Sequence, residues 1–516
     1  MKTKKIIYTA AGVILLSLSA CSDFLDPKSQ SEYVPQNANA LQEMLLGSAY
    51  PKPKDNLDIL AFMDFFSDDI QLHKTNYEFD NNTAYRTEAL KSFFTWQPDM
   101  FFTSERTGYG VYNIWESYYK YILGANAALD YINDVSGTEA EKDYVKAQAL
   151  GLRGFYYFLL VNHFGAPYNY NKDALGVPLK LNSNLLPEDQ ILMVRNTVEE
   201  VYTQILLDLD EAERLFLSLS KDKQYQPNYM INLPMVELLK SRIFLYMENW
   251  KDAAVYASKV INDWEFTLLN LNTIPEPTDV IPYYNFTSLK SPEVIWLYGR
   301  IDDLTAHYST TNVVKTESGW SGDVTYLRKA FNTSDVLLNS FQPGDLRKDL
   351  YIVKEYDTNN SEFFEDAYVP FAKYNISPTG IPDGDENFAL AFRLSEAYLN
   401  LAEASAHNNA EGAALKAMST LLENRYLPAN YTEPSGLTGD ALIAFIQKER
   451  QKELCFEGHR WFDLRRYGMP QITRTWEGEV YTLRHNDRSY TMPIPDEVLR
   501  KNKKLEQNPL APQREN

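Results

Sequence analysis

The sequence contains almost no cysteine, and this scarcity restricts how the fold can be stabilised. Of its 516 residues only Cys21 and Cys455 are cysteines, which leaves no framework of disulfide bonds. Stability must therefore come from a hydrophobic core. A chain of this length with 44% hydrophobic residues can bury a large one, either as a single domain or as two closely joined halves.

Residues that common enzymes and metal sites require are also sparse. The six histidines are scattered, and the chain has neither a His-Glu-x-x-His motif nor a paired-cysteine zinc spacing. Gly319 to Gly322 falls one residue short of a nucleophile elbow. Asp383 to Asn387 offers several oxygen ligands but lacks the spacing of a calcium loop, so we interpret it as a solvated turn. The sequence predicts no enzyme, no cofactor and no metal.

Positive charge is in short supply. The 50 Lys and Arg residues face 70 Asp and Glu residues, which gives a formal net charge of -20. Nucleic acid is excluded as a partner on this ground, because phosphate binding needs a basic face. Long apolar runs are also missing, since no stretch after residue 20 approaches the ~20 apolar residues of a membrane-spanning helix.

Residues 1–20 have the layout of a lipoprotein signal peptide. A basic start is followed by an apolar run from Ile6 to Leu18, and Leu18-Ser19-Ala20-Cys21 resembles the lipobox of bacterial lipoproteins. Ser22 and Asp23 resemble the acidic tag of lipoproteins sent to the cell surface. We expect cleavage before Cys21, lipidation of its thiol, and an outer-membrane anchor that faces the exterior. Loss of the three leader lysines would take the net charge to -23.

Helical periodicity dominates the rest of the chain. Apolar residues repeat every three or four positions through 115–129 and 145–159, with a break at Gly137 and Thr138 that predicts a helical hairpin. Thr197 and Glu200 predict a capping box, and another helix should begin at Pro234. The spacing returns through 394–421 and 441–457. We predict a mostly α fold with about four tetratricopeptide-like helix pairs, at about 109–262 and 389–458.

Two segments show little periodicity and are predicted to be irregular. The first runs from 22 to about 108, and the second is an insertion at about 263–388 rich in Pro, Asn, Gly and aromatic residues. A loop as long as the second is usually functional. We therefore predict a lipid-anchored tether at 21–35 and a single domain at 36–516, whose irregular segments pack on one side of the helices.

Several stretches, taken together, resemble the SusD/RagB family. They occur in the family's order over nearly the whole chain, at 21–26, 147–165 with 176–179, 393–404, 449–465, 492–495 and 508–509. The resemblance implies four tetratricopeptide-like helix pairs, a ligand face built from the irregular segments, no catalysis, and a SusC-like TonB-dependent transporter as partner. Family members capture oligosaccharides or, in some branches, peptides.

Glycan capture needs flat apolar rings beside polar groups, because the faces of pyranose rings are apolar while their hydroxyls need directional partners. Trp320 is the leading candidate, because its small polar neighbours in Glu317 to Asp323 cannot bury it. Trp96 is a second candidate beside Phe93 and Phe94. The remaining candidates form two clusters: Tyr283, Tyr284 and Asn285, and Tyr77 and Asn81.

A charged block near the C-terminus could be mistaken for an active site. Glu449, Glu453 and Glu457 repeat every four residues, so each can meet an arginine on its own or a neighbouring helix. We interpret the block, with Arg450, Arg460, Asp463 and Arg465, as a structural ion-pair network.

Three hypotheses for function remain open. The first is a cell-surface lipoprotein that binds oligosaccharides for a transporter. The second keeps the architecture but makes the cargo a peptide, which would need exposed backbone donors and acceptors more than flat rings. The third is a surface glycoside hydrolase, which needs two carboxylates flanking one cleft.

Overall fold

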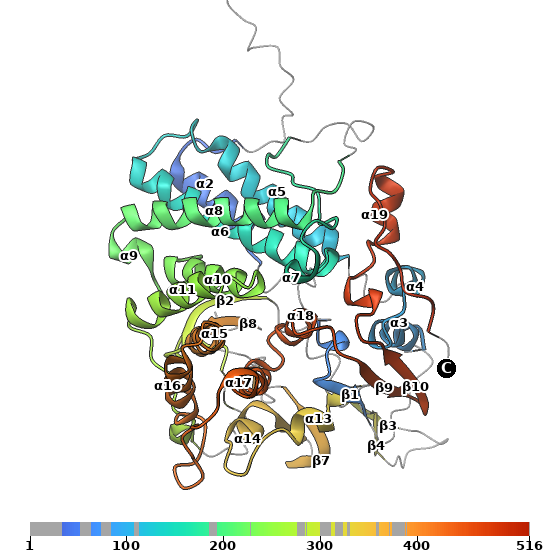
Figure 1. The fold of residues 1–516 in the computed structure, drawn as a ribbon. Coiled ribbons are helices and arrows are strands. Elements are labelled where there is room, and N and C mark those ends of the chain that lie inside the picture. The colour runs from blue at the N-terminus through green and yellow to red at the C-terminus, as the bar shows by residue number, and fades with distance from the viewer. Residues whose placement is uncertain are drawn as a thin grey trace, which may run out of the picture.

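The structure is a computed structural model of the 516-residue chain. It describes residues 34–51, 63–73, 84–107, 113–184, 193–227, 229–275, 284, 286–299, 311–314, 324–327, 331–357, 361–370, 372–373, 388 and 390–514. Helices make up most of it and stack side by side in the body of the molecule (Figure 1). Within these residues no helix is both long and apolar enough to cross a membrane.

The first helical hairpin forms where the sequence predicts it. α5 (Ile114–Tyr131) and α6 (Glu139–Phe164) pack together, and α6 begins with a capping box between Thr138 and Glu141. α8 (Val198–Ser218) packs against α6 and starts with the predicted box of Thr197 and Glu200. Each box satisfies backbone N–H groups that a helix start leaves without partners.

The second group of helices follows the same logic. α10 (Leu233–Tyr246) has a proline in its first turn, and a sharp turn with Glu248 at φ 58° leads into α11 (Trp250–Asn262). α15 (Leu394–His407) packs on α11, on α16 (Glu411–Leu422) and on α17 (Gly439–Leu454). The predicted mostly helical fold is confirmed, whereas its tetratricopeptide-like geometry stays a prediction.

The segment before residue 108 is more regular than predicted. It contains α2 (Ala38–Ser48), the 3₁₀ helix η1 (Met63–Phe66), β1 (Ile70–Leu72), α3 (Ala84–Phe94) and α4 (Met100–Thr107). The Asn37 side chain caps α2 by accepting a bond from Ala40 N, and Leu41 and Leu45 are fully buried against α5 and α6. The expectation of an irregular segment is wrong here, because tertiary packing stabilises elements too short to show a clear period.

The insertion at 263–388 also contains regular elements. These are η2 (Leu271–Thr273), β2 (Val294–Tyr298), β3 (Thr311–Val314), β4 (Val324–Leu327), β5 (Phe331–Thr333), α13 (Asp335–Leu338), α14 (Arg347–Tyr351), β6 (Val353–Asp357) and β7 (Glu362–Val369). All five residues of β2 are buried, and β2 pairs with β8 (Leu390–Arg393). Phe155 of α6 makes edge-to-face ring contacts with Trp296 and Phe392 of this pair. This part of the insertion is therefore core rather than ligand face.

The remaining described elements are α7 (Tyr168–Asn171), α9 (Lys221–Gln224), α18 (Arg460–Arg466), β9 (Ile472–Trp476), β10 (Glu479–Leu483), η3 (Arg488–Tyr490) and α19 (Asp496–Lys501). β1 pairs antiparallel with β5, and β9 pairs antiparallel with β10. The Asn332 side chain extends β5 towards β7, because it donates to Asp366 O (2.8 Å) and accepts from Tyr368 N (2.7 Å).

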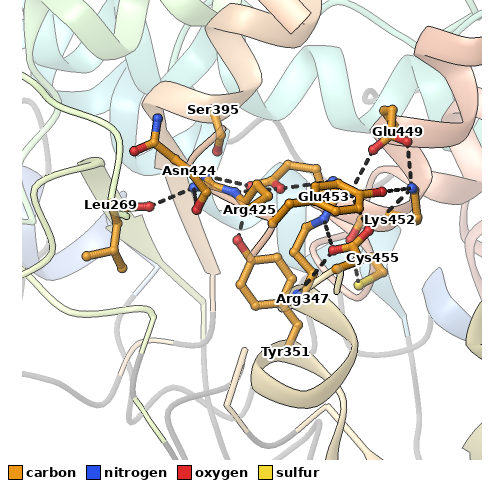
Figure 2. A network of polar contacts seen from close by, with 12 residues as sticks. Leu269, Arg347, Tyr351, Ser395, Asn424, Arg425, Glu449, Lys452, Glu453 and Cys455 are labelled. Carbon is orange, nitrogen blue, oxygen red and sulfur yellow. Dashed lines mark hydrogen bonds and ion pairs between the residues drawn. The ribbon is translucent and has the colours of Figure 1, made fainter. Parts of the chain in front are cut away.

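Glu453 of α17 lies at the centre of a buried ion-pair network. Its carboxylate accepts bonds from Arg393 (2.6 Å), from Arg425 (2.9 Å) and from Tyr351 OH (3.2 Å), and it is fully buried (Figure 2). Burial alone would raise the pKa of Glu453, but the charges of Arg425 and Arg393 hold that pKa well below its usual range. We call this group, with Arg347, Glu449 and Glu457, the Glu453 network.

The other carboxylates of the block are paired as well. Arg347 joins Asp345 to Glu449 at 2.7 Å each, and Glu457 accepts from Arg393 at 2.8 Å. The predicted structural network is confirmed, with one exception. Arg465 donates to the backbone carbonyls of Asn162 and Gly165, and burial lowers its pKa to about 10.

Candidate functional site

A groove with a volume of about 700 Å³ opens where β1 and β9 come together. Cα atoms of the two strands approach within 8 Å of each other. The groove is lined by Asp68, Ile70, Gln71, Leu72, His73, Phe94, Ser334, Val336, Gln471, Ile472, Thr473, Arg474, Thr475, Glu477 and Gly478. We call it the β1–β9 groove. Its volume is within the range of small-ligand sites, about 300–1,000 Å³.

The β1 wall is held in place by side-chain bonds to α13. Gln71 donates to the Asp335 carboxylate and accepts from Asp335 N, both at 3.1 Å. Ser334 caps α13 by accepting a bond from Leu337 N (3.2 Å), and its hydroxyl donates to Asp68 O (2.6 Å). The amide of Gln71 is therefore oriented before any ligand arrives, which lowers the entropy cost of binding.

The β9 wall follows from strand alternation. Ile472, Arg474 and Trp476 are buried, whereas Thr473 and Thr475 are exposed. Glu477 and Gly478 both have positive φ, 50° and 89°, as a tight hairpin turn into β10 requires. As a result β9 and its ends present a row of exposed polar side chains, which are Gln471, Thr473, Thr475 and Glu477.

Arg474 anchors this strand to the body of the protein. Its guanidinium donates to the backbone carbonyls of Phe65 and Phe94. It also lies 4.3 Å from the ring centroids of Phe94 and Trp96. The guanidinium of Arg474 thus contacts the protein beneath the groove.

The two carboxyl groups that directly precede β1 in the chain, those of Asp68 and Asp69, have different surroundings. Asp68 is bound by Arg460 through two bonds of 2.7 and 2.8 Å. Asp69 is fully buried and accepts one bond from Gln451 (2.8 Å). Burial, with the Asp68 charge beside it, raises the pKa of Asp69 to about 8.

Asp69→Asn is expected to stabilise the protein above pH 8. A raised folded-state pKa means that the folded protein binds this proton more tightly than the unfolded chain does. The stability that this proton contributes is therefore complete below about pH 4, which is the ordinary pKa of Asp, and is lost as pH rises through 8. Urea unfolding from pH 5 to 9 should show stability falling more steeply in wild type than in Asp69→Asn. The exposed Asp440→Asn serves as control, and equal slopes in wild type and Asp69→Asn would contradict this assignment.

The structure places only two of the predicted ligand residues. Trp96 is fully buried, and its indole N–H donates to Phe66 O at 3.1 Å. The prediction that Trp96 binds ligand is therefore wrong, because its ring has no surface to offer. Tyr284 is half-buried and packs on Phe286, with ring centroids 4.7 Å apart, and it does not line the β1–β9 groove.

The remaining predicted residues lie outside the described residues. They are Cys21, Tyr77, Asn81, Tyr283, Asn285, Trp320 and the segment 383–387. Trp320 lies in the segment 315–323 that joins β3 to its antiparallel partner β4. Only residues 328–330 separate β4 from β5, which pairs with β1 of the groove. Trp320 is thus connected along the chain to a groove wall, and its role stays a prediction.

Sequence reasoning missed the exposed residues of β9. Residues 472–476 alternate apolar and polar side chains, and residues 479–483 follow a two-residue turn, which together is typical of a β-hairpin. That signal could have identified Thr473 and Thr475. Within the described residues, no group of three or more His, Cys, Asp or Glu side chains is placed to hold a metal ion.

Comparisons with known proteins extend these observations. A family model described as the SusD family matches residues 305–510, and one described as starch-binding associating with outer membrane matches residues 23–231. SusD-like protein P38 of Formosa agariphila is 24% identical in an alignment of 379 positions, which covers 68% of this chain and 71% of that protein.

Solved structures of similar fold cover nearly the whole chain. A SusD superfamily protein from Bacteroides thetaiotaomicron matches with a TM-score of 0.66 at 20% identity, over 92% of this chain and 100% of that one. A laminarin binding SusD-like protein matches with a TM-score of 0.58 at 20% identity, over 92% and 99%. At these identities the likeness shows the fold.

Proposed function

Because this chain belongs to the SusD/RagB family, we propose that it is a lipoprotein that captures oligosaccharides at the cell surface. Lipidated Cys21 would anchor it to the outer membrane, and a SusC-like TonB-dependent transporter would receive the cargo. The description of the family model over residues 23–231 supports the membrane location. A similar structure is that of a laminarin binding protein, which supports glycan as the cargo class.

The observation that carries the proposal is the β1–β9 groove. Gln71 is held in a fixed orientation by Asp335, and Thr475 and Gln471 are exposed on the opposite wall. Fixed amides and hydroxyls suit the hydroxyl groups of a sugar chain, which need directional partners. The exposed apolar side chain of Val336 at the groove adds contact surface for the apolar face of a ring.

A peptide bound by strand addition fits this groove less well. Neighbouring strands lie about 4.8 Å apart, so a strand inserted between β1 and β9 would need roughly 9.6 Å between them. Cα atoms of β1 and β9 approach within 8 Å.

Hydrolysis is also disfavoured at this site. A glycoside hydrolase needs two carboxylates that flank one cleft, but the Asp68 carboxylate is bound through both oxygens by Arg460.

Calorimetric titration tests the proposal. The protein, purified in detergent, is titrated with gluco-, manno- and galacto-oligosaccharides and with a mixed library of short peptides. We expect at least one glycan to bind with a Kd in the micromolar to millimolar range and no peptide to match it. Binding of peptides without any glycan would contradict the proposal, as would release of sugar during incubation.

A further inference from the structure

We infer that the β1–β9 groove selects uncharged oligosaccharides over carboxylated or sulfated ones. This inference rests on the proposed function and specifies the substrate class of the same groove. It follows from the side chains that face the groove, from the partners of the nearby cations and from the carboxylate at one of its ends.

The exposed wall of β9 is mainly uncharged. Gln471, Thr473 and Thr475 carry amide and hydroxyl groups that can both donate and accept hydrogen bonds. The Oγ1 atoms of Thr473 and Thr482 lie 3.3 Å apart across the hairpin and form a hydrogen bond. Such groups match sugar hydroxyls, which are also donors and acceptors, but they cannot neutralise an anion.

The cations at the floor of the groove already have partners. Arg474 is only 7% exposed and donates to the carbonyls of Phe65 and Phe94. Arg460 is held by both oxygens of Asp68. An anionic sugar could recruit Arg460 only by breaking its two bonds to Asp68, and a buried group that loses its partner is costly. Arg474 is buried and offers a ligand little surface.

Negative charge lies at one end of the groove. The Asp68 carboxylate is paired with Arg460, so the charge that a ligand would meet is that of Glu477, which is exposed at the end of β9. A sugar carboxylate placed beside Thr475 would lie near Glu477, two residues further along the chain in the turn that follows β9. Like charges brought together in this way oppose binding, which makes the groove selective by repulsion as well as by attraction.

Matched ligand pairs test the inference on the full-length protein in detergent. The pairs are galacto-oligosaccharide with oligogalacturonate, manno-oligosaccharide with oligomannuronate, and gluco-oligosaccharide with its C6-oxidised form. Within any pair that binds, we expect the neutral member to bind about tenfold more tightly or better at low salt. The preference should shrink at high salt, because salt screens the repulsion.

Two variants and one control variant locate the preference in the groove. Thr475→Lys should raise the affinity for the anionic member and reduce the preference, whereas Thr475→Gln, of similar size, should retain it. Glu477→Gln should also reduce the preference, and thermal melts of all three variants should match wild type because both positions are exposed.

Three outcomes separate the inference from the proposed function. Equal or tighter binding of anionic members by wild type would overturn the inference alone. If that binding were lost in Arg328→Gln or Lys329→Gln, the basic pair between β4 and β5 would be its cause. An unchanged preference for neutral ligands in Thr475→Lys would also overturn the inference. If no glycan of either series bound, the proposed function itself would fail.

Discussion

Glu453→Gln is expected to lower the free energy of unfolding by about 3–5 kcal/mol. The Glu453 carboxylate is fully buried and lies within 3.4 Å of the guanidiniums of Arg347, Arg393 and Arg425. Glutamine has nearly the same shape but removes the negative charge, so the three arginines lose a shared counter-charge in a buried site. Leaving buried charges uncompensated is among the most destabilising effects of a single substitution.

Urea or guanidinium unfolding followed by circular dichroism measures this loss. Glu423→Gln, an exposed glutamate just after α16, is the matched control and should change stability by less than about 0.5 kcal/mol. A loss below about 1 kcal/mol in Glu453→Gln would show that the network contributes little to stability.

The Glu453 carboxyl group also predicts how the stability difference between wild type and Glu453→Gln changes with pH. Because the folded-state pKa of Glu453 is lowered, its contribution to stability is complete above the ordinary glutamate value of about 4.3. That contribution is lost as pH falls below 4.3 towards the folded-state pKa. The stability gap between wild type and Glu453→Gln should therefore narrow on acidification. A gap that widened in acid would contradict the assignment.

Trp320→Ala is expected to weaken oligosaccharide binding by roughly 30-fold, which corresponds to about 2 kcal/mol for a tryptophan anchor. The ring lies in a segment of small polar residues between β3 and β4, and its own neighbours cannot bury it. The apolar faces of pyranose rings pack well on such a ring. Thermal melts should stay unchanged, because no core contact is predicted for this side chain.

Trp264→Phe is the control for the loss of a tryptophan elsewhere. Trp264 lies just after the end of α11, and its indole N–H donates to the Glu237 carboxylate at 2.8 Å. α11 lies on the opposite side of the body from β9 (Figure 1). This variant should bind oligosaccharide as wild type does. Unchanged binding by Trp320→Ala would remove Trp320 from the site and leave the β1–β9 groove to be tested alone.

The helices could be predicted because their signals are local. The buried residues Val145, Ala149, Leu152, Tyr156 and Leu159 repeat within one helix, and the capping residue Thr197 lies three positions before Glu200. Such patterns need no knowledge of distant partners. α2 was missed because its helical spacing is short: only Ala38, Leu41 and Leu45 are buried, and the pattern does not continue beyond them within the helix.

The groove could not be predicted, because its walls come from opposite ends of the chain. Ile70 and Ile472 line the same groove, and β1 has only three residues, too few for alternation to be recognised. The error at Trp96 has a similar cause. The sequence cannot reveal that Phe66 O accepts its N–H or that Arg474 covers its ring.

The position of a bound oligosaccharide in a crystal of the complex tests the account most directly. A neutral oligosaccharide that binds in solution should lie in the β1–β9 groove, with hydroxyls within hydrogen-bond distance of Gln71, Gln471 or Thr475 and one ring against Trp320. A glycan bound at another face, with the groove empty, would contradict the assignment of the site.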